Sequence, residues 1–522
     1  MIGRAGHRHK RVADGTVTSG RVAGGVLLNV LATLIVAGTG FFLTAFVIHR
    51  LGAEAFGAWV LIVSVLAYSS ILDFGVGLTV MRFVAEVAHL PDREAANRIV
   101  STAVMVFTGV GGVVLVGGLI AAPHMADLFG VAPPEQADFT TAFRISLVAL
   151  ALTFPSAVWT AVLLGLHDFA RLNVWVVGQA LAVMLGQMTV VAMGHGIVAL
   201  AAVGAVGNVA LLLGKRASAR GHGIRTSPRL CDSATLRRIV RVSTWVFLLN
   251  VSGRLILDTD AILIGVVLGT AAVAAYQVAL GPATAVRRAA DQFNSVSLTA
   301  AASLKAQDER VRLRALLTEA TRAVTCVFLP CIALLAAWGE ELLRLWVGPE
   351  FTSSYATLVV LTVGVLAIAI QGTAGQVLLA LERHRLMALV ATIEALCNVA
   401  LSVALARRFG IVGVAWGTTI PTLITAFGIT LPYACRLVGV PYRVVMGRLV
   451  RPFLIAAAAY GAMALALEGI GSFANLGAFL AASSVVLVVV LGASLLADRE
   501  ARRTYIPLLR AVPLRRARPV QA

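Results

Sequence analysis

The sequence has few charged residues. Only 13% of its 522 residues are charged and 59% are hydrophobic, whereas a soluble domain carries charge on about a quarter of its residues. Water therefore cannot be the main solvent of the chain. A helix needs about twenty apolar residues to cross a hydrocarbon core of about 30 Å, and such stretches follow one another almost from end to end. We predict an all-α polytopic membrane protein.

Reactive and metal-binding motifs are also scarce. The five cysteines form no CxxC pair and mostly lie in or beside apolar runs, so neither a metal site nor a disulfide framework is indicated. P-loop, HExxH and nucleophile-elbow patterns do not occur. We therefore expect no catalytic residue, no bound metal and no cofactor. The cysteines are Cys231, Cys326, Cys331, Cys397 and Cys435.

Hydropathy predicts about fourteen transmembrane helices, in two sets of six followed by a last pair. The predicted segments are 23–48, 56–80, 98–122, 142–165, 172–193, 196–214, 243–268, 271–300, 320–347, 353–381, 386–406, 411–434, 450–468 and 474–497.

Basic residues lie in alternate gaps between these segments. The net charge of +18 therefore reflects membrane topology and not a nucleic-acid partner: about 35 Lys and Arg fall on the side assigned to the cytoplasm. No signal-peptide core with a cleavage site precedes the first long helix. We expect a bacterial inner-membrane protein with both termini cytoplasmic. The basic residues on the outer side are Arg50, Arg144, Arg344, Arg407 and Arg408.

An internal repeat divides the chain. "RLGAEAFGAW" at Arg50–Trp59 resembles "VLGTAAVAAY" at Val267–Tyr276, an offset of about 217 residues, and weaker echoes recur near 214. Because each set has an even number of helices, the two lobes share one orientation and form a parallel repeat. The predicted divisions are a basic N-terminus (1–22), a first lobe (23–214), a linker (215–242), a second lobe (243–436), two further helices (437–497) and a basic tail (498–522).

Four stretches resemble the bacterial polysaccharide and O-antigen (Wzx-type) flippase family. They are "LGAEAFGAWVLIVSVLAYSSILDFGVGLTVMRFVAE" (Leu51–Glu86), "GLHDFARLN" (Gly165–Asn173), "GRLILDTDAILIGVVLG" (Gly253–Gly269) and "RRFGIVGVAWGTTI" (Arg407–Ile420). That family belongs to the multidrug/oligosaccharidyl-lipid/polysaccharide (MOP) exporter superfamily, with the MATE-type multidrug exporters and the lipid II flippases. Glu394 departs from the family pattern, which more often has a neutral residue there.

The resemblance implies a MATE-like fold with a central cavity. It implies export of undecaprenyl-pyrophosphate-linked oligosaccharide, by alternating access, for cell-surface polysaccharide such as O-antigen or exopolysaccharide. Membrane lipids, glycosyltransferases and a polysaccharide polymerase are the implied partners, and H⁺ or Na⁺ coupling is an open expectation. A cation-coupled multidrug exporter or a lipid II flippase remains an alternative. A membrane glycan polymerase or ligase is disfavoured, because the longest predicted outer loop, 122–141, offers no convergent set of polar residues.

Charged residues inside the predicted helices are the candidate site, because each costs about 2.5 to 3.5 kcal/mol near mid-bilayer. Arg254 lies about 20 Å along its helix from the cytoplasmic end, with Asp258 four residues on. Either the two form a structural ion pair, or Arg254 binds an anionic headgroup with bidentate geometry and Asp258 releases it. Asp260 is a coupling carboxylate or a packing acceptor.

Arg287, Arg288 and Asp291 form a second group in the cytoplasmic third of the segment 271–300. The arginines either snorkel with Asp291 as their local pair or form a basic mouth that gathers the headgroup. Asp73 and Glu394 are further coupling or gating candidates. Asn250, Gln371 and Gln376 are weaker ones that either line the cavity or bond between helices.

The alternation of charge predicts that residues 215–241 face the cytoplasm. Alkaline phosphatase fused at Arg225 should therefore be inactive, and a cytoplasmic reporter at the same position should be active. Phosphatase activity there would contradict the topology.

Overall fold

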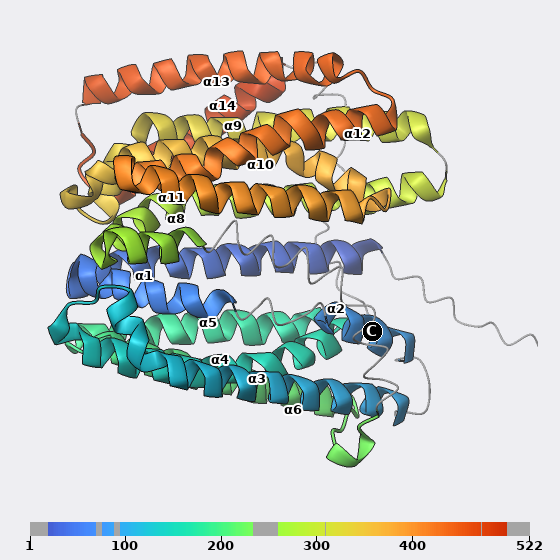
Figure 1. The fold of residues 1–522 in the computed structure, drawn as a ribbon. Helices are drawn as coiled ribbons and strands as arrows, with labels where there is room; N and C mark the ends of the chain where they lie inside the picture. Colours follow the sequence, from blue (N-terminus) through green and yellow to red (C-terminus); the bar gives the residue numbers. More distant parts are fainter. Residues whose placement is uncertain are drawn as a thin grey trace, which may run out of the picture.

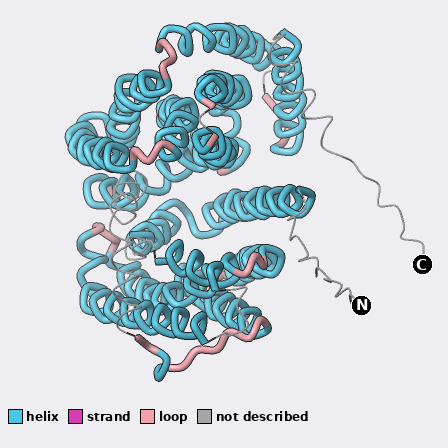
Figure 2. The backbone as a smooth tube through the Cα atoms, turned by 90° about the vertical axis from the view of Figure 1, so that its right-hand side faces the viewer, coloured by secondary structure: helices cyan, strands magenta, loops and turns pink. Residues whose placement is uncertain are grey.

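The computed structural model describes residues 19–68, 76–87, 94–232, 259–307, 309–470 and 472–497. All regular elements within these ranges are helical, as the apolar composition requires (Figure 2). Nine described helices are long and apolar enough to cross a membrane. The all-α, multi-pass prediction is confirmed, while the count of about fourteen spans stays a prediction.

The first lobe contains α1 to α6. Its elements are α1 (Ser19–Ala67), α2 (Val76–Val87), α3 (Glu94–Leu128), η2 (Pro133–Glu135), α4 (Gln136–Gly165), α5 (Phe169–Ala192), α6 (Ile197–Gly221) and η3 (Pro228–Leu230). The two ends of the predicted helix 56–80 lie in α1 and α2, and its residues 69–75 lie outside the described residues.

The second lobe begins with a short helix, Thr259–Leu268. It continues with α8 (Thr270–Ala306), α9 (Arg310–Trp346), η4 (Pro349–Ser354), α10 (Tyr355–Ala380), α11 (His384–Leu423), the π-helical turn η5 (Ile424–Thr430) and α12 (Leu431–Val438). The last pair is α13 (Tyr442–Ile470) and α14 (Leu476–Ala497). This pair is anchored on α9, where the Trp338 indole donates to the Met463 carbonyl at 2.8 Å.

The two lobes form two stacks of helices, with α1 and α8 side by side between them (Figure 1). In the lower stack of that view α4 packs against α3 and α6, and in the upper stack α10 packs against α8 and α9. The parallel two-lobe arrangement predicted from the repeat is confirmed.

The repeat is visible in the backbone itself. Gly52 interrupts α1 with φ 83° and ψ 171°, and Gly269, 217 residues later, precedes α8 with φ 88° and ψ 176°. Residues that carry a Cβ rarely adopt such a positive φ, which explains why glycine occurs at both positions. Similarly, His167 and Glu382 both have φ 60°, in the turns that follow α4 and α10. The weaker echo at Gly196 and Gly410 differs in conformation.

The lobes meet most closely where α1 passes the start of α8. A Cβ on Gly57 would overlap the carbonyl oxygen of Thr270, so the backbones touch there. Elsewhere along α1, Trp346 of α9 stacks on Phe41 with ring centroids 4.2 Å apart, and its indole donates to the Phe41 carbonyl at 3.1 Å. These contacts connect the two lobes.

Replacing Gly57 with alanine should weaken this contact, because the new methyl group meets backbone that cannot rotate away. We expect Gly57→Ala to lower the free energy of unfolding by about 1 to 3 kcal/mol, measured by reversible unfolding in mixed micelles. Gly109→Ala is the matched control, since no atom lies within 4 Å of a Cβ there. Equal stability of the two variants would contradict the close contact.

Candidate functional site

A cavity of about 440 Å³ lies between the two lobes. One wall is α1, and the other walls are the helix Thr259–Leu268, α8, α10 and α11. The wall residues recur at helical spacing, as expected where one face of each helix points inward. α10 supplies apolar side chains and a glycine, whereas α8 and α11 supply most of the polar ones. The polar lining residues are Thr44, Ser64, Asp260, Tyr276, Gln277, Thr284, Arg287, Arg288, Thr418, Thr419 and Thr422.

Two adjacent arginines carry the positive charge of this cavity. Arg287 and Arg288 lie on α8, about 26 Å along the helix from Thr270, and both line the cavity. Arg287 contacts Asp291 at 3.4 Å, as the local pairing predicted, and its side chain is 19% exposed against 49% for Asp291. Arg288 is exposed and has no ion pair with another described residue. The local pairing with Asp291 is therefore present for Arg287, and the interpretation of the arginines as a basic mouth stays a prediction.

A buried hydrogen-bond network surrounds Asp260. The Asp260 carboxylate is 4% exposed and its Oδ2 accepts from the Tyr276 hydroxyl at 2.5 Å and from the Thr418 hydroxyl at 2.8 Å. Asn398 in turn donates to Thr418 at 2.9 Å. Because Asp260, Tyr276 and Thr418 also line the cavity, this network forms part of its wall.

Glu394 lies behind the wall and not in it. It is 9% exposed, and its two carboxylate oxygens accept from Thr422 and Thr425, each at 2.8 Å. Thr422 lines the cavity while Glu394 does not. A single hydroxyl therefore separates this carboxylate from the cavity space.

The other predicted residues are placed as follows. Gln371 and Gln376 are half-buried on α10 and are not among the lining residues of this cavity. The remaining candidates lie outside the described residues. These are Asp73, Asn250, Arg254 and Asp258.

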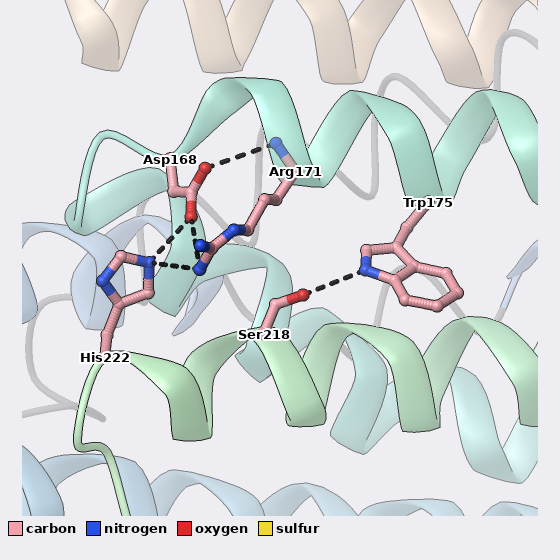
Figure 3. A network of polar contacts seen from close by, with 5 residues as sticks. All are labelled: Asp168, Arg171, Trp175, Ser218 and His222. Carbon is pink, nitrogen blue, oxygen red and sulfur yellow. Dashed lines mark hydrogen bonds and ion pairs between the residues drawn. The ribbon is translucent and has the colours of Figure 1, made fainter.

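The "GLHDFARLN" segment forms a polar clamp away from the cavity (Figure 3). Asp168 caps α5 by accepting from the Arg171 amide at 3.3 Å and contacts His222, at the end of α6, at 2.7 Å. One turn further along α5, the Trp175 indole donates to the Ser218 hydroxyl at 2.9 Å. These contacts fasten α5 to α6, which assigns this segment a structural role.

Sequence reasoning missed the aromatic lining. Trp59 and Tyr276 both face the cavity from opposite lobes. They occupy matching positions in the repeat, since each follows its kink glycine by seven residues. Looking for chemically similar residues at equivalent positions of the two repeat halves would have identified this pair.

The fold of this chain resembles those of solved membrane transporters. A structure entitled "Lipid II flippase MurJ, inward closed conformation" has a TM-score of 0.72 at 14% identity and covers 93% of this chain and 100% of that one. An inward-facing multidrug resistance MATE family transporter has a TM-score of 0.67 at 15% identity, covering 77% of this chain and 94% of that one. At such identities these likenesses show the fold alone.

Comparison of the amino-acid sequence shows to which protein family the chain belongs. The family described as "Polysaccharide biosynthesis protein" matches residues 51–356, more than half of the chain, and the chain belongs to that family. A Shigella flexneri protein described as "Putative O-antigen transporter" is 24% identical over 132 residues, which span 25% of this chain and 30% of that relative. The resemblance to the polysaccharide flippases is thereby confirmed.

The geometry predicts energetic coupling between Glu394 and Thr422. Thr422→Val should lower the free energy of unfolding by about 1 to 3 kcal/mol, because a buried carboxylate oxygen loses its donor. In a Glu394→Leu background the same substitution should lower the free energy of unfolding far less. The interaction energy between the two side chains should then be about 0.5 to 3 kcal/mol.

Reversible unfolding of the four proteins measures this cycle. Thr189→Val is the control, since that exposed hydroxyl bonds only to its own helix, at Leu185. Additive effects of the two substitutions would contradict the buried bond.

Proposed function

We propose that this protein is a flippase that moves a lipid-linked oligosaccharide across the bacterial inner membrane, and that it is not an enzyme. The observation that carries the proposal is the pair of adjacent arginines in a cavity between the lobes. An undecaprenyl-pyrophosphate-linked glycan presents the matching charge, and membership of the polysaccharide biosynthesis family supports this substrate class.

The two arginines suit a pyrophosphate. A guanidinium offers planar paired donors that match phosphate oxygens two at a time. Arg287 contacts Asp291 at 3.4 Å. Arg288 forms no ion pair with a carboxylate of the described residues, so a headgroup can bind Arg288 without breaking one there.

The rest of the cavity suits a sugar. Trp59 offers an apolar ring face, and the hydroxyls of Thr284 and Thr418 offer hydrogen bonds. A small number of polar groups on a mostly apolar wall is the usual composition of a small-molecule site. The cavity volume of about 440 Å³ accommodates a headgroup with its first sugars, so a longer glycan would extend beyond it.

The closed end of the lobes supports alternating access. The contact of Gly57 joins the lobes at the start of α8, whereas Arg287 and Arg288 lie about 26 Å further along the same helix. Under the positive-inside topology the joined end is periplasmic and the arginines lie on the cytoplasmic, loading side. Transport would then consist of opening the joined end while the arginine end closes.

Asp260 and Glu394 are the proposed coupling carboxylates. Both are buried acidic groups on transmembrane helices, where charge is expensive and usually functional. Each accepts hydrogen bonds from two hydroxyl groups. A proton or Na⁺ could bind at either, and the partners of the pathway would be glycosyltransferases and a polymerase acting on the same glycan.

A cation-coupled multidrug exporter is the second candidate, favoured by the aromatic lining of Trp59 and Tyr276. The arginines oppose it, because a cationic drug prefers a carboxylate-dominated cavity. A lipid II flippase would differ chiefly in the sugar that it carries.

Neutralising Arg288 should abolish most transport. In cells lacking the native flippase, we expect Arg288→Gln to reduce surface glycan at least about tenfold through loss of a charge-assisted bond. Arg288→Lys should retain part of the export, because the charge remains without the bidentate geometry. Arg220→Gln, an exposed arginine of α6 outside the cavity, is the control and should export normally.

A further pair of variants separates binding from local pairing. If Arg287 only neutralises Asp291, the double variant Arg287→Gln/Asp291→Asn should restore the glycan export that Arg287→Gln loses. If Arg287 binds substrate, the double variant stays inactive although the protein accumulates in the membrane. Full export by both arginine variants would refute the flippase site.

A further inference from the structure

A second cavity, of about 470 Å³, lies at one end of the second lobe. Here α8, α10 and α12 end and α9 and α11 begin. Its wall shares no residue with the central cavity. The charged residues that line it are Lys305, Glu309, Arg310, Arg314 and Arg383, and most of the others are leucine or valine.

Arg314 is held in place by the end of α12. Its Nε donates to the Val438 carbonyl at 2.9 Å. Gly439 follows in the left-handed conformation with φ 78°, and a Cβ there would lie 2.8 Å from a terminal nitrogen of Arg314. The glycine therefore both ends the helix and leaves room for the guanidinium. Only one of the donors of Arg314 is used by this bond.

The acidic groups around the cavity are already paired. Lys305 donates to Glu382 at 2.9 Å, and this hydrogen bond lowers the pKa of the Glu382 carboxyl, so the pair stays ionised at neutral pH. Glu309 contacts Arg312 at 2.8 Å. Within the described ranges Arg314 and Arg383 contact no carboxylate. The cavity therefore has a positive excess.

The exposed side chains of the cavity wall are basic, with one apolar exception. Lys305, Arg310, Arg314 and Arg383 are exposed, and the exposed apolar side chain is Leu437, at 37%. Cations beside an exposed apolar side chain, at the ends of membrane helices, match a phospholipid, which joins an anionic phosphodiester to acyl chains. A soluble phosphate ester shares the phosphate but gains nothing from Leu437.

We propose that this cavity binds the phosphodiester headgroup of an anionic phospholipid, with Arg314 and Arg383 on the phosphate and Leu437 beside the acyl chain. Because the site is separate from the central cavity, it does not depend on which substrate is transported. A lipid bound here touches the ends of five helices of the second lobe and would hold them together.

Native mass spectrometry of the purified full-length protein in detergent tests the proposal. The probes are dioleoylphosphatidylglycerol and, as the neutral lipid, dioleoylphosphatidylcholine. We expect preferential retention of phosphatidylglycerol, and an apparent affinity at least about tenfold weaker in Arg314→Gln/Arg383→Gln. Arg225→Gln/Arg229→Gln removes the same charge from exposed positions of the first lobe and should bind as the unaltered protein does.

Three results would overturn the proposal. They are undiminished binding in the cavity variant, an equal loss in the control variant, and displacement of the lipid by glycerophosphate at equal concentration, which would assign the site to soluble phosphate esters. Because Arg314 also caps α12, Arg383→Gln alone is tested if the double variant unfolds. Arg383 is exposed, and its loss should weaken lipid binding without changing the unfolding temperature of the lipid-free protein.

Discussion

The backbone contact between Gly57 and Thr270 is the constraint on which the arrangement of the lobes depends. Helices in a bilayer gain little from burying apolar side chains against one another, since lipid is equally apolar, and close approach through small residues takes the place of that gain. Gly52 and Gly269 supply the matching kinks that bring α1 and α8 to this point. With the lobes joined there, the helices diverge along α8 and leave the central cavity.

Hydroxyl groups form hydrogen bonds with three of the buried ionisable groups in the described ranges. Glu394 accepts from two threonines, and Asp260 accepts from Tyr276 and a threonine. In the first lobe the buried Lys215 donates to Thr160 at 2.9 Å and contacts Ser156 at 3.4 Å. A hydroxyl offers a compact hydrogen bond without adding a second charge that must itself be desolvated.

The sequence predicted most of the fold for a simple physical reason. Apolar length is a local property, and the glycine-centred repeat marks the kinks directly, so helices and lobes could be inferred from the printed residues. Lys215, placed in the linker by its charge, lies buried in α6, because hydropathy does not register two hydroxyls on a neighbouring helix.

Site residues were harder to predict, because membership of a cavity depends on which helix face meets which lobe. Arg287 and Arg288 could be found from charge alone. Thr418 and Thr422 could not, since threonine is common in membrane helices for other reasons. Glu394 was found as a charge, but its position behind the wall depends on the pairing of α11 with its own continuation beyond Gly410.

The same hydroxyls would provide a physical route between the proposed substrate and the proposed coupling ion. Thr418 and Thr422 line the cavity, and each donates to one of the two buried carboxylates. A sugar or phosphate that competes for either hydroxyl would remove a donor from Asp260 or Glu394, and a carboxylate that loses a donor binds a proton or cation more strongly. By reciprocity, an ion bound at either carboxylate would alter the affinity of the cavity for its substrate by the same factor. Two threonines one helical turn apart are thus sufficient to link the proposed transport site to the proposed coupling sites.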